Sequence, residues 1–380
     1  MSLILMGISV CLILFIIKKI YIRNWHKGIS AEIDISRENT FPGEELMLTE
    51  TIINRKWLPL PMIQVKFEID RSFVFGDEVV NVNVSDHCYK SDIFSLLFYQ
   101  KITRKLPFTC THRGYFTIED INVVSTDVMM DTTLAKIFYV GKSITVYPAE
   151  VSCEEVEIPY RKIMGTVLTS RYAYEDPFEF RGIREYQTYD SLKDINWMAS
   201  ARTGELKVNI HGYTASRQVA LLINLENDGI WEYEQLKEKS ISMALSLACC
   251  LIEQGVAVSL LSNGRDKISG REVIIQSGCD ENHKINIMTQ LARIDLKKQP
   301  SDFETVIEKY RDELGKDALY CMISTSRRKE LQLYYNDIAA GSEGSVWIYP
   351  YNTGFETCFD YINKAEIICW EVNNDTESRI

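Results

Sequence analysis

The feature that most constrains this chain is the apolar run at its N-terminus. Met1 to Ile17 carries no charge, and Lys18 and Lys19 are followed by three more apolar residues before Arg23. A helix rises about 1.5 Å per residue, so 22 residues reach roughly 33 Å, enough to cross a bilayer. We therefore predict a transmembrane anchor over residues 1–23. The alternative is a buried helix in the core of a soluble domain.

The charges around the run predict its orientation. Lys18, Lys19, Arg23 and Lys27 all follow it, whereas a cleaved signal peptide has its positive charge before the apolar segment. Positively charged flanks remain in the cytoplasm, so the sequence predicts a single-pass cell-membrane protein with the bulk of the chain cytoplasmic. Ten cysteines without a C-x-x-C pair are typical of reduced thiols in that compartment. The net charge of −11 argues against a nucleic-acid partner.

Residues 30–150 have the pattern of an all-β domain. Ile63, Val65, Phe67 and Ile69 alternate with polar residues, and similar period-2 segments recur up to Val146. Strands of this kind bury one face each. The prediction is a small β-sandwich-like domain.

Residues 217–380 have a different pattern, in which apolar runs alternate with amphipathic segments. Val219 to Leu225 is a continuous apolar run, as expected of a strand that is covered on both faces. Asn263-Gly264 predicts a hairpin turn. We expect helices near 231–254, 283–294, 302–314 and 327–340, and strands near 256–261, 319–323, 346–349 and 367–372. This alternation predicts an α/β domain with a mostly parallel sheet.

Between these domains, residues 151–216 mix aromatic and charged side chains in a connector with a short charged helix. Ser191 followed by Asp194 predicts a helix start, and Gly204 predicts its end. Among the charged and aromatic residues of this segment are Glu179, Arg184, Tyr186, Asp190, Trp197 and Arg202.

This spacing, together with Ile195 and the run Ala199-Ser200-Ala201-Arg202, resembles the signature of the domain of unknown function 58 family. The chain departs from that signature at Tyr189, Asn196 and Met198. The resemblance implies a bacterial, membrane-attached protein with a β-rich N-terminal part and a von Willebrand factor A-like, Rossmann-type C-terminal part. It also implies association with a MoxR-type AAA+ ATPase.

The signature has two interpretations. Arg184 and Arg202 can pair with Glu179 and Asp190 under Trp197 and so stabilise the loop. Alternatively, Arg184, Tyr186, Trp197 and Arg202 anchor a partner, since these residue types are common in interface hot spots. The function that we expect is a membrane-anchored interaction or scaffold protein, a partner of a MoxR-type ATPase in envelope-linked assembly, and not an enzyme.

The alternative function is a metal-dependent adhesion or hydrolytic domain. A von Willebrand A-like fold would hold its cation at the end of the first α/β strand, where this chain has Asn224, Glu226 and Asp228. These residues are candidates for a degenerate Mg²⁺ site, because the usual Asp-x-Ser-x-Ser pattern is missing. We expect no other cofactor.

Overall fold

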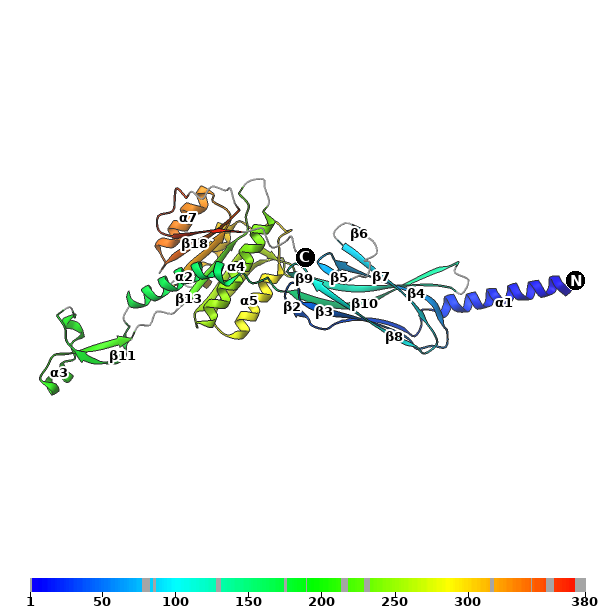
Figure 1. Cartoon of the computed structure of the whole chain (residues 1–380), viewed down its shortest axis with the longest axis horizontal. Helices are drawn as coiled ribbons and strands as arrows, with labels where there is room; N and C mark the ends of the chain where they lie inside the picture. Colours follow the sequence, from blue (N-terminus) through cyan, green and yellow to red (C-terminus); the bar gives the residue numbers. More distant parts are fainter. Residues whose placement is uncertain are drawn as a thin grey trace. The chain divides into compact units, whose positions relative to one another are not determined.

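The computed structural model folds into two compact units, Met1–Ala149 and Glu150–Ile380 (Figure 1). The structure describes residues 2–76, 83–84, 87–127, 131–173, 176–188, 190–212, 218–228, 233–314, 318–342, 344–352 and 359–372.

The first unit begins with one long helix, α1 (Ser2–Asn24). Its segment Ile4–Asn24 is long and apolar enough to cross a membrane. Every side chain from Ile4 to Ile17 is exposed, whereas Tyr21 and Trp25 are buried against the β-domain that follows. The helix therefore has a free apolar part and a docked C-terminal part.

The β-domain of this unit contains two sheets. The first has the strand order β1 (Ile29–Ile35), β3 (Glu45–Asn54), β8 (Lys101–Cys110) and β5 (Phe73–Phe75). The second has the order β2 (Asn39–Thr40), β10 (Thr133–Val146), β9 (Gly114–Thr126), β4 (Leu60–Asp70), β7 (His87–Leu96) and β6 (Asn83–Val84). All pairs are antiparallel except β2 with β10.

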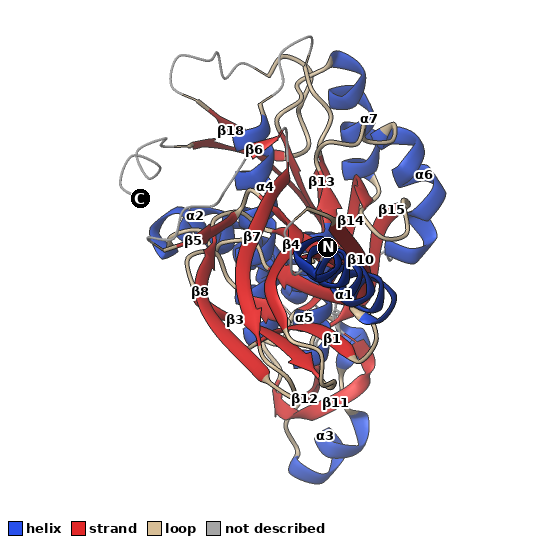
Figure 2. Ribbon diagram, turned by 90° about the vertical axis from the view of Figure 1, so that its right-hand side faces the viewer, coloured by secondary structure: helices blue, strands red, loops and turns tan. Residues whose placement is uncertain are grey.

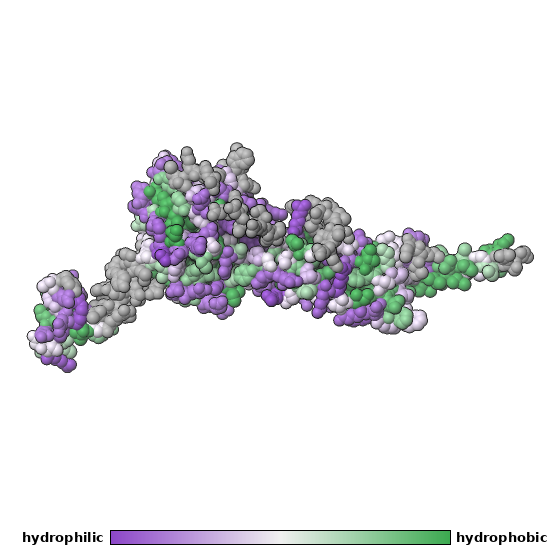
Figure 3. Space-filling model, viewed as in Figure 1, coloured by the Kyte–Doolittle hydropathy of each residue, from purple (hydrophilic) through white to green (hydrophobic). Residues whose placement is uncertain are grey.

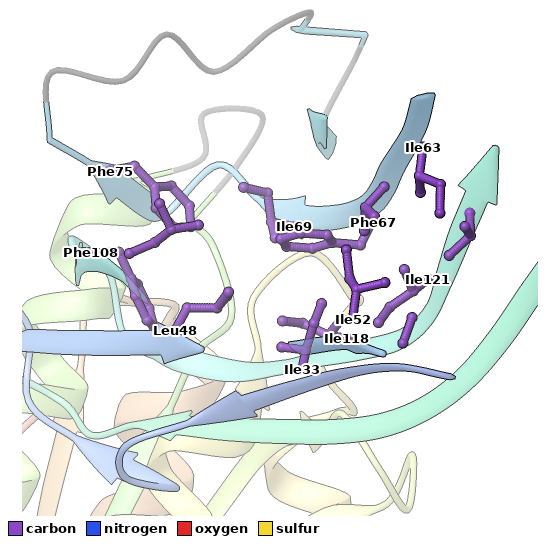
Figure 4. Packing of buried hydrophobic residues seen from close by; sticks show 14 of the residues in the cluster. Ile33, Leu48, Ile52, Ile63, Phe67, Ile69, Phe75, Phe108, Ile118 and Ile121 are labelled. Carbon is purple, nitrogen blue, oxygen red and sulfur yellow. The ribbon is translucent and has the colours of Figure 1, made fainter. Parts of the chain in front are cut away.

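The two sheets share one apolar core, as the alternating pattern of the sequence predicts. Ile33 and Leu48 come from the first sheet, and Ile63, Phe67 and Ile121 come from the second (Figure 4). Inward residues occupy every second position, for example in β4, where Ile63, Val65, Phe67 and Ile69 are buried. The unit is therefore a β-sandwich.

The second unit begins with α2 (Cys153–Ala173), continues through a separate hairpin, and contains one mixed sheet. That sheet has the order β15 (Glu272–Gly278), β14 (Ala257–Asp266), β13 (Gln218–Asn224), β17 (Leu319–Ser324), β18 (Ser345–Tyr351) and β19 (Glu366–Glu371), with β16 (Ile294–Asp295) against β14. The strands from β14 to β19 in this order are parallel, and β15 and β16 are antiparallel to β14.

Helices cover both faces of this sheet. They are α4 (Glu234–Glu253), α5 (Glu281–Arg293), α6 (Phe303–Leu314) and α7 (Lys329–Ala340). In Figure 2, α4 and α6 lie on opposite sides of β13 and β14. Buried side chains of α6 and α7, among them Phe303 and Tyr335, pack against Leu222 and Trp347 of the sheet. The continuous apolar run of β13 is buried for this reason.

The connector contains the helix α2, with Pro159 inside it, in addition to the short charged helix that the sequence predicts. One local prediction was wrong. Asn263-Gly264 is not a hairpin turn, because both residues lie inside β14. A Cβ atom on Gly264 would meet Ile294 Cγ2 and Leu225 Cδ1, each at 2.7 Å, so this glycine permits a close approach of neighbouring side chains.

Candidate functional site

The signature segment folds into a β-hairpin with a short helix. Strands β11 (Asp176–Glu185) and β12 (Lys207–Gly212) pair antiparallel, and between them lie the 3-10 turn η1 (Leu192–Asp194) and α3 (Trp197–Thr203). Ile195 and Val208 are buried and form a bridge between the loop and β12. The hairpin thus has a small apolar centre of its own.

A bidentate ion pair joins the end of β11 to the loop. Arg184 Nη1 and Nη2 donate to the two carboxylate oxygens of Asp190 at 2.6 and 2.5 Å, and the Gln187 N–H donates to Asp190 at 2.8 Å. The Arg184 guanidinium, together with the Gln187 N–H, holds the pKa of Asp190 below its ordinary value. The pair is half-buried and fixes the shape of the turn before η1.

Asn196 connects α3 to β12. Its Oδ1 accepts from the Ala199 N–H at 2.9 Å, which caps the helix, and its Nδ2 donates to Asn209 Oδ1 at 2.7 Å. Ser200 Oγ donates to the Asn196 carbonyl and accepts from the Lys207 N–H, both at 2.8 Å. The expected helix start at Ser191 is corrected accordingly, since Ser191 caps only η1 and α3 begins after Asn196.

The end of α3 is as the sequence predicts. Gly204 has φ +75° and donates its N–H to the Ser200 carbonyl, a left-handed C-cap that glycine adopts without strain.

The hairpin carries several large apolar side chains that are exposed. Trp197 is 68% exposed and Met198 is 73% exposed, although both lie in the first turn of α3. Among the described side chains of the hairpin the exposed ones, called here the hairpin patch, are Phe180, Ile183, Leu192, Trp197, Met198 and Leu206. Figure 3 shows apolar colour on this hairpin and along α1. Clusters of exposed apolar residues on a folded surface are typical of interaction sites.

The structure places the signature residues in different environments. It brings Arg184 and Asp190 together, as one interpretation predicted. Tyr186 is half-buried and its N–H donates to the Leu206 carbonyl, whereas Trp197 and Arg202 are exposed. The side chain of Glu179 lies outside the described residues. A pairing of Arg202 with Glu179 therefore lies outside the described residues, and the exposed Trp197 does not bury Arg202.

The candidate metal residues lie in a polar network at the C-terminal edge of the sheet. Asn224 is buried at the end of β13, donates to Ser324 Oγ at 3.1 Å, and accepts from Asn263 Nδ2 at 3.0 Å. Asn263 also donates to the Ser301 carbonyl at 3.0 Å and accepts from the Leu225 N–H at 2.9 Å. Asparagine side chains thus link the loops after three strands.

The two carboxylates of this edge already have donors from the protein. Glu226 accepts from Arg328 Nη2 and from the Phe303 N–H, the latter at 3.1 Å. Asp228 accepts from Ser326 Oγ at 2.6 Å and from the Arg327 N–H. Among the described residues no group of three or more His, Cys, Asp or Glu could hold a metal ion. Arg328 supplies the positive charge that a cation would otherwise bring.

Titration with Mg²⁺ or Mn²⁺ is expected to give no binding heat and no change in the melting temperature. A cation would have to displace Arg328 from Glu226 and Ser326 from Asp228, which replaces satisfied contacts rather than filling free ligands. Isothermal calorimetry on the full chain in detergent measures this directly. Saturable heat that disappears in Glu226→Gln would contradict the interpretation.

Local sequence patterns do not predict Asn263 and Arg328 as members of this network. Asn263 was assigned to a turn because glycine follows it, and Arg328 lies about a hundred residues away from Glu226 along the chain. The available signal was the polar pair Ser262-Asn263, which directly follows the apolar run of β14. Parallel strands bring such positions to one edge of a sheet.

Comparisons with known proteins give one family match. The family described as "Protein of unknown function DUF58" matches residues 182–339, a stretch that contains Arg184, Tyr186, Asp190, Trp197 and Arg202. A search of the curated proteins finds no match.

Several solved structures resemble parts of the chain. The CARDB domain of the PF1109 protein from Pyrococcus furiosus is 14% identical, with 31% of this chain and 91% of that chain covered and a TM-score of 0.22. A non-cellulosomal cohesin from Archaeoglobus fulgidus is 10% identical, with coverages of 34% and 96% and a TM-score of 0.23. TM-scores this low do not establish a shared fold. Over residues 182–339, this chain is therefore similar to the DUF58 family.

Proposed function

We propose that this protein is a membrane-anchored docking platform whose hairpin patch binds a AAA+ ATPase of the MoxR type in envelope-linked assembly. The observation that carries the proposal is the exposure of Trp197 and Met198. The hairpin that presents them is held by the Asn196 cap and the Arg184–Asp190 ion pair. Leaving such side chains in water is unfavourable by itself. A partner that covers them would gain that free energy on binding.

The chemistry of the hairpin suits protein recognition better than catalysis. Tryptophan and arginine are enriched among residues that dominate binding energy, and the hairpin presents both Trp197 and Arg202 to solvent. The pair Arg184–Asp190 and the cap Asn196 keep the presenting loop rigid, which lowers the entropic cost of binding. The ATPase as partner follows from the family resemblance.

The same proposal places the body of the protein in the cytoplasm. The free part of α1 is apolar from Ile4 to Ile17, and Lys18, Lys19, Arg23 and Lys27 follow it. Positive flanks of a membrane span favour the cytoplasmic side, where an ATPase has access to its nucleotide.

The test is a pull-down from detergent-solubilised membranes, with and without ATP. We expect an AAA+ ATPase to be recovered with the unaltered protein, and Trp197→Ala to reduce recovery about tenfold, as for a hot-spot residue. The control is Tyr139→Ala, because Tyr139 is an aromatic residue that is 84% exposed in the other unit. No ATPase in either nucleotide condition would reject the partner, and equal recovery with Trp197→Ala would reject the hairpin patch.

A further inference from the structure

A second group of exposed aromatic residues lies at the end of the β-sandwich that α1 leaves. Two loops form this end, the segment 55–59 after β3 and the turn 97–100 between β7 and β8. Trp57 and Phe98 stack across them with ring centroids 5.7 Å apart and an interplanar angle of 19°. Trp57 is 75% exposed and Phe98 is 53% exposed, and Leu97 and Tyr99 beside them are exposed as well. Stacking therefore does not bury these rings.

The two loops are held rigidly beside α1. The buried Asn54 donates to the carbonyls of both Leu58 and Leu97, at 2.9 and 2.8 Å. The Tyr99 N–H donates to the Lys56 carbonyl at 3.2 Å, and Lys56 Nζ donates to the carbonyls of Asn24 and Trp25 at the end of α1. One chain of hydrogen bonds thus connects the helix end to both aromatic loops.

The backbone of Tyr99 has a conformation that is unusual for a bulky residue. Its φ of +55° lies in the left-handed region, which a bulky side chain rarely adopts. Strain of this kind persists where the surrounding structure imposes it, and it is often associated with function. Here the conformation accompanies an exposed tyrosine ring beside Phe98.

The length of the free helix fixes where this end would lie in a membrane. From Ser2 to Ile17 the helix is roughly 24 Å long at about 1.5 Å per residue, against about 30 Å of hydrocarbon. The next residue, Lys18, is already bound to the sandwich, since its Nζ lies 2.5 Å from Asp131 Oδ2 and 3.8 Å from Asp127 Oδ2. No spacer separates the apolar segment from the β-domain.

Basic residues adjoin the aromatic loops in the chain and occupy the end of α1. The exposed lysine and arginine residues at this end are Lys19, Arg23, Lys27, Arg55 and Lys101. The acidic residues Asp127 and Asp131 both pair with Lys18. Anionic headgroups attract such basic groups, and tryptophan and tyrosine favour the boundary between hydrocarbon and water.

We propose that this end of the sandwich is a lipid-binding surface. Trp57, Leu97, Phe98 and Tyr99 lie in the headgroup layer of the bilayer that α1 enters, and the basic residues contact anionic lipid headgroups. This inference rests on the membrane anchoring contained in the proposed function. It adds that the folded domain itself, and not only the helix, binds the bilayer.

The test reconstitutes the full chain in vesicles of phosphatidylglycerol and phosphatidylcholine with bromine on the acyl chains near the headgroups. Bromine quenches tryptophan emission at short range. We expect the unaltered protein to lose a larger fraction of its emission than Trp57→Phe, because Trp57 contributes the lipid-exposed signal. The matched control Trp197→Phe removes another exposed tryptophan, and we expect it to lose at least as large a fraction of its emission as the unaltered protein.

Flotation of the vesicles separates the two proposals. If the chain does not float with the vesicles, membrane anchoring itself is rejected. If it floats and Trp57→Phe is quenched as strongly as the unaltered protein, the anchor stands and the lipid-binding surface is rejected. The melting temperatures of the variants test whether Trp57→Phe remains folded, which the exposure of Trp57 predicts.

Discussion

Replacing Asn263 by alanine is expected to lower the free energy of unfolding of the second unit by about 3–5 kcal/mol. The Asn263 side chain is fully buried and makes three hydrogen bonds, to the Leu225 N–H, to Asn224 Oδ1 and to the Ser301 carbonyl. Alanine would leave these three groups without that partner in a site that water does not reach. A buried group that loses its hydrogen bond costs about 1–3 kcal/mol.

Hydrogen exchange of the full-length protein in detergent measures this effect within one unit. The paired strands β13 and β17 lie inside the sheet. We expect their amides to exchange only when the sheet unfolds extensively, so their protection reports the stability of the sheet. The control is Asn363→Ala, the same change at an exposed position, for which about 0.5 kcal/mol or less is expected. Equal protection in both variants would show that the asparagine network does not stabilise this edge.

Replacing Glu50 by glutamine is expected to stabilise the sandwich, with an effect that depends on pH. Glu50 of β3 is buried between the two sheets, and Asp92 and Lys90 of β7 and Arg104 of β8 are the charged groups around it. Burial first, and the Asp92 carboxylate second, raise the pKa of Glu50 from 4.5 to about 8. Lys90 lies over the Phe75 ring, and Arg104 donates to Asp92 at 2.7 Å.

The direction of this pH dependence follows from whether Glu50 holds a proton in the folded and in the unfolded state. Below pH 4.5 Glu50 is protonated in both states and has no effect on the pH dependence. Between pH 4.5 and about 8 the folded state keeps a proton that the unfolded state releases, so stability falls as the pH rises. Glutamine removes this penalty, which amounts to roughly 3 kcal/mol at pH 7.

The measurement compares hydrogen exchange of β3 and β8 in the variant and the unaltered protein at the same pH, near 5 and near 8. We expect a large gain in protection at the higher pH and little gain at the lower one. Glu45→Gln on the same strand is the control, because Glu45 is exposed. A gain that is the same at both pH values would attribute the effect to packing and not to ionisation.

The sequence predicted those parts of the fold that depend on local patterns. Alternation in β4 and the continuous apolar run of β13 follow directly from which faces are buried. Gly204 was recognised as a helix end because a left-handed C-cap needs only one residue type. Such features require no knowledge of distant residues.

The rest depended on contacts between distant parts of the chain. Gly264 resembles a turn residue in the sequence, but glycine is required there because the side chains of Leu225 and Ile294, which are distant in sequence, pack against it. The partner of Glu226 is Arg328, and no local spacing connects the two. In the hairpin, the sequence suggested that Arg184 and Arg202 pair with Glu179 and Asp190, but it could not show that Arg184 binds Asp190 or that Trp197 remains exposed.

The docked end of α1 has a mechanical consequence. Tyr21 is buried and its hydroxyl lies 3.1 Å from Ser125 Oγ, while Lys18 and Trp25 fix the helix on either side of it. The sandwich and the helix therefore lack a hinge at the point where a flexible tether would bend. Once α1 is in a bilayer, a pull on the sandwich would be transmitted to the lipid as a tilt of the helix.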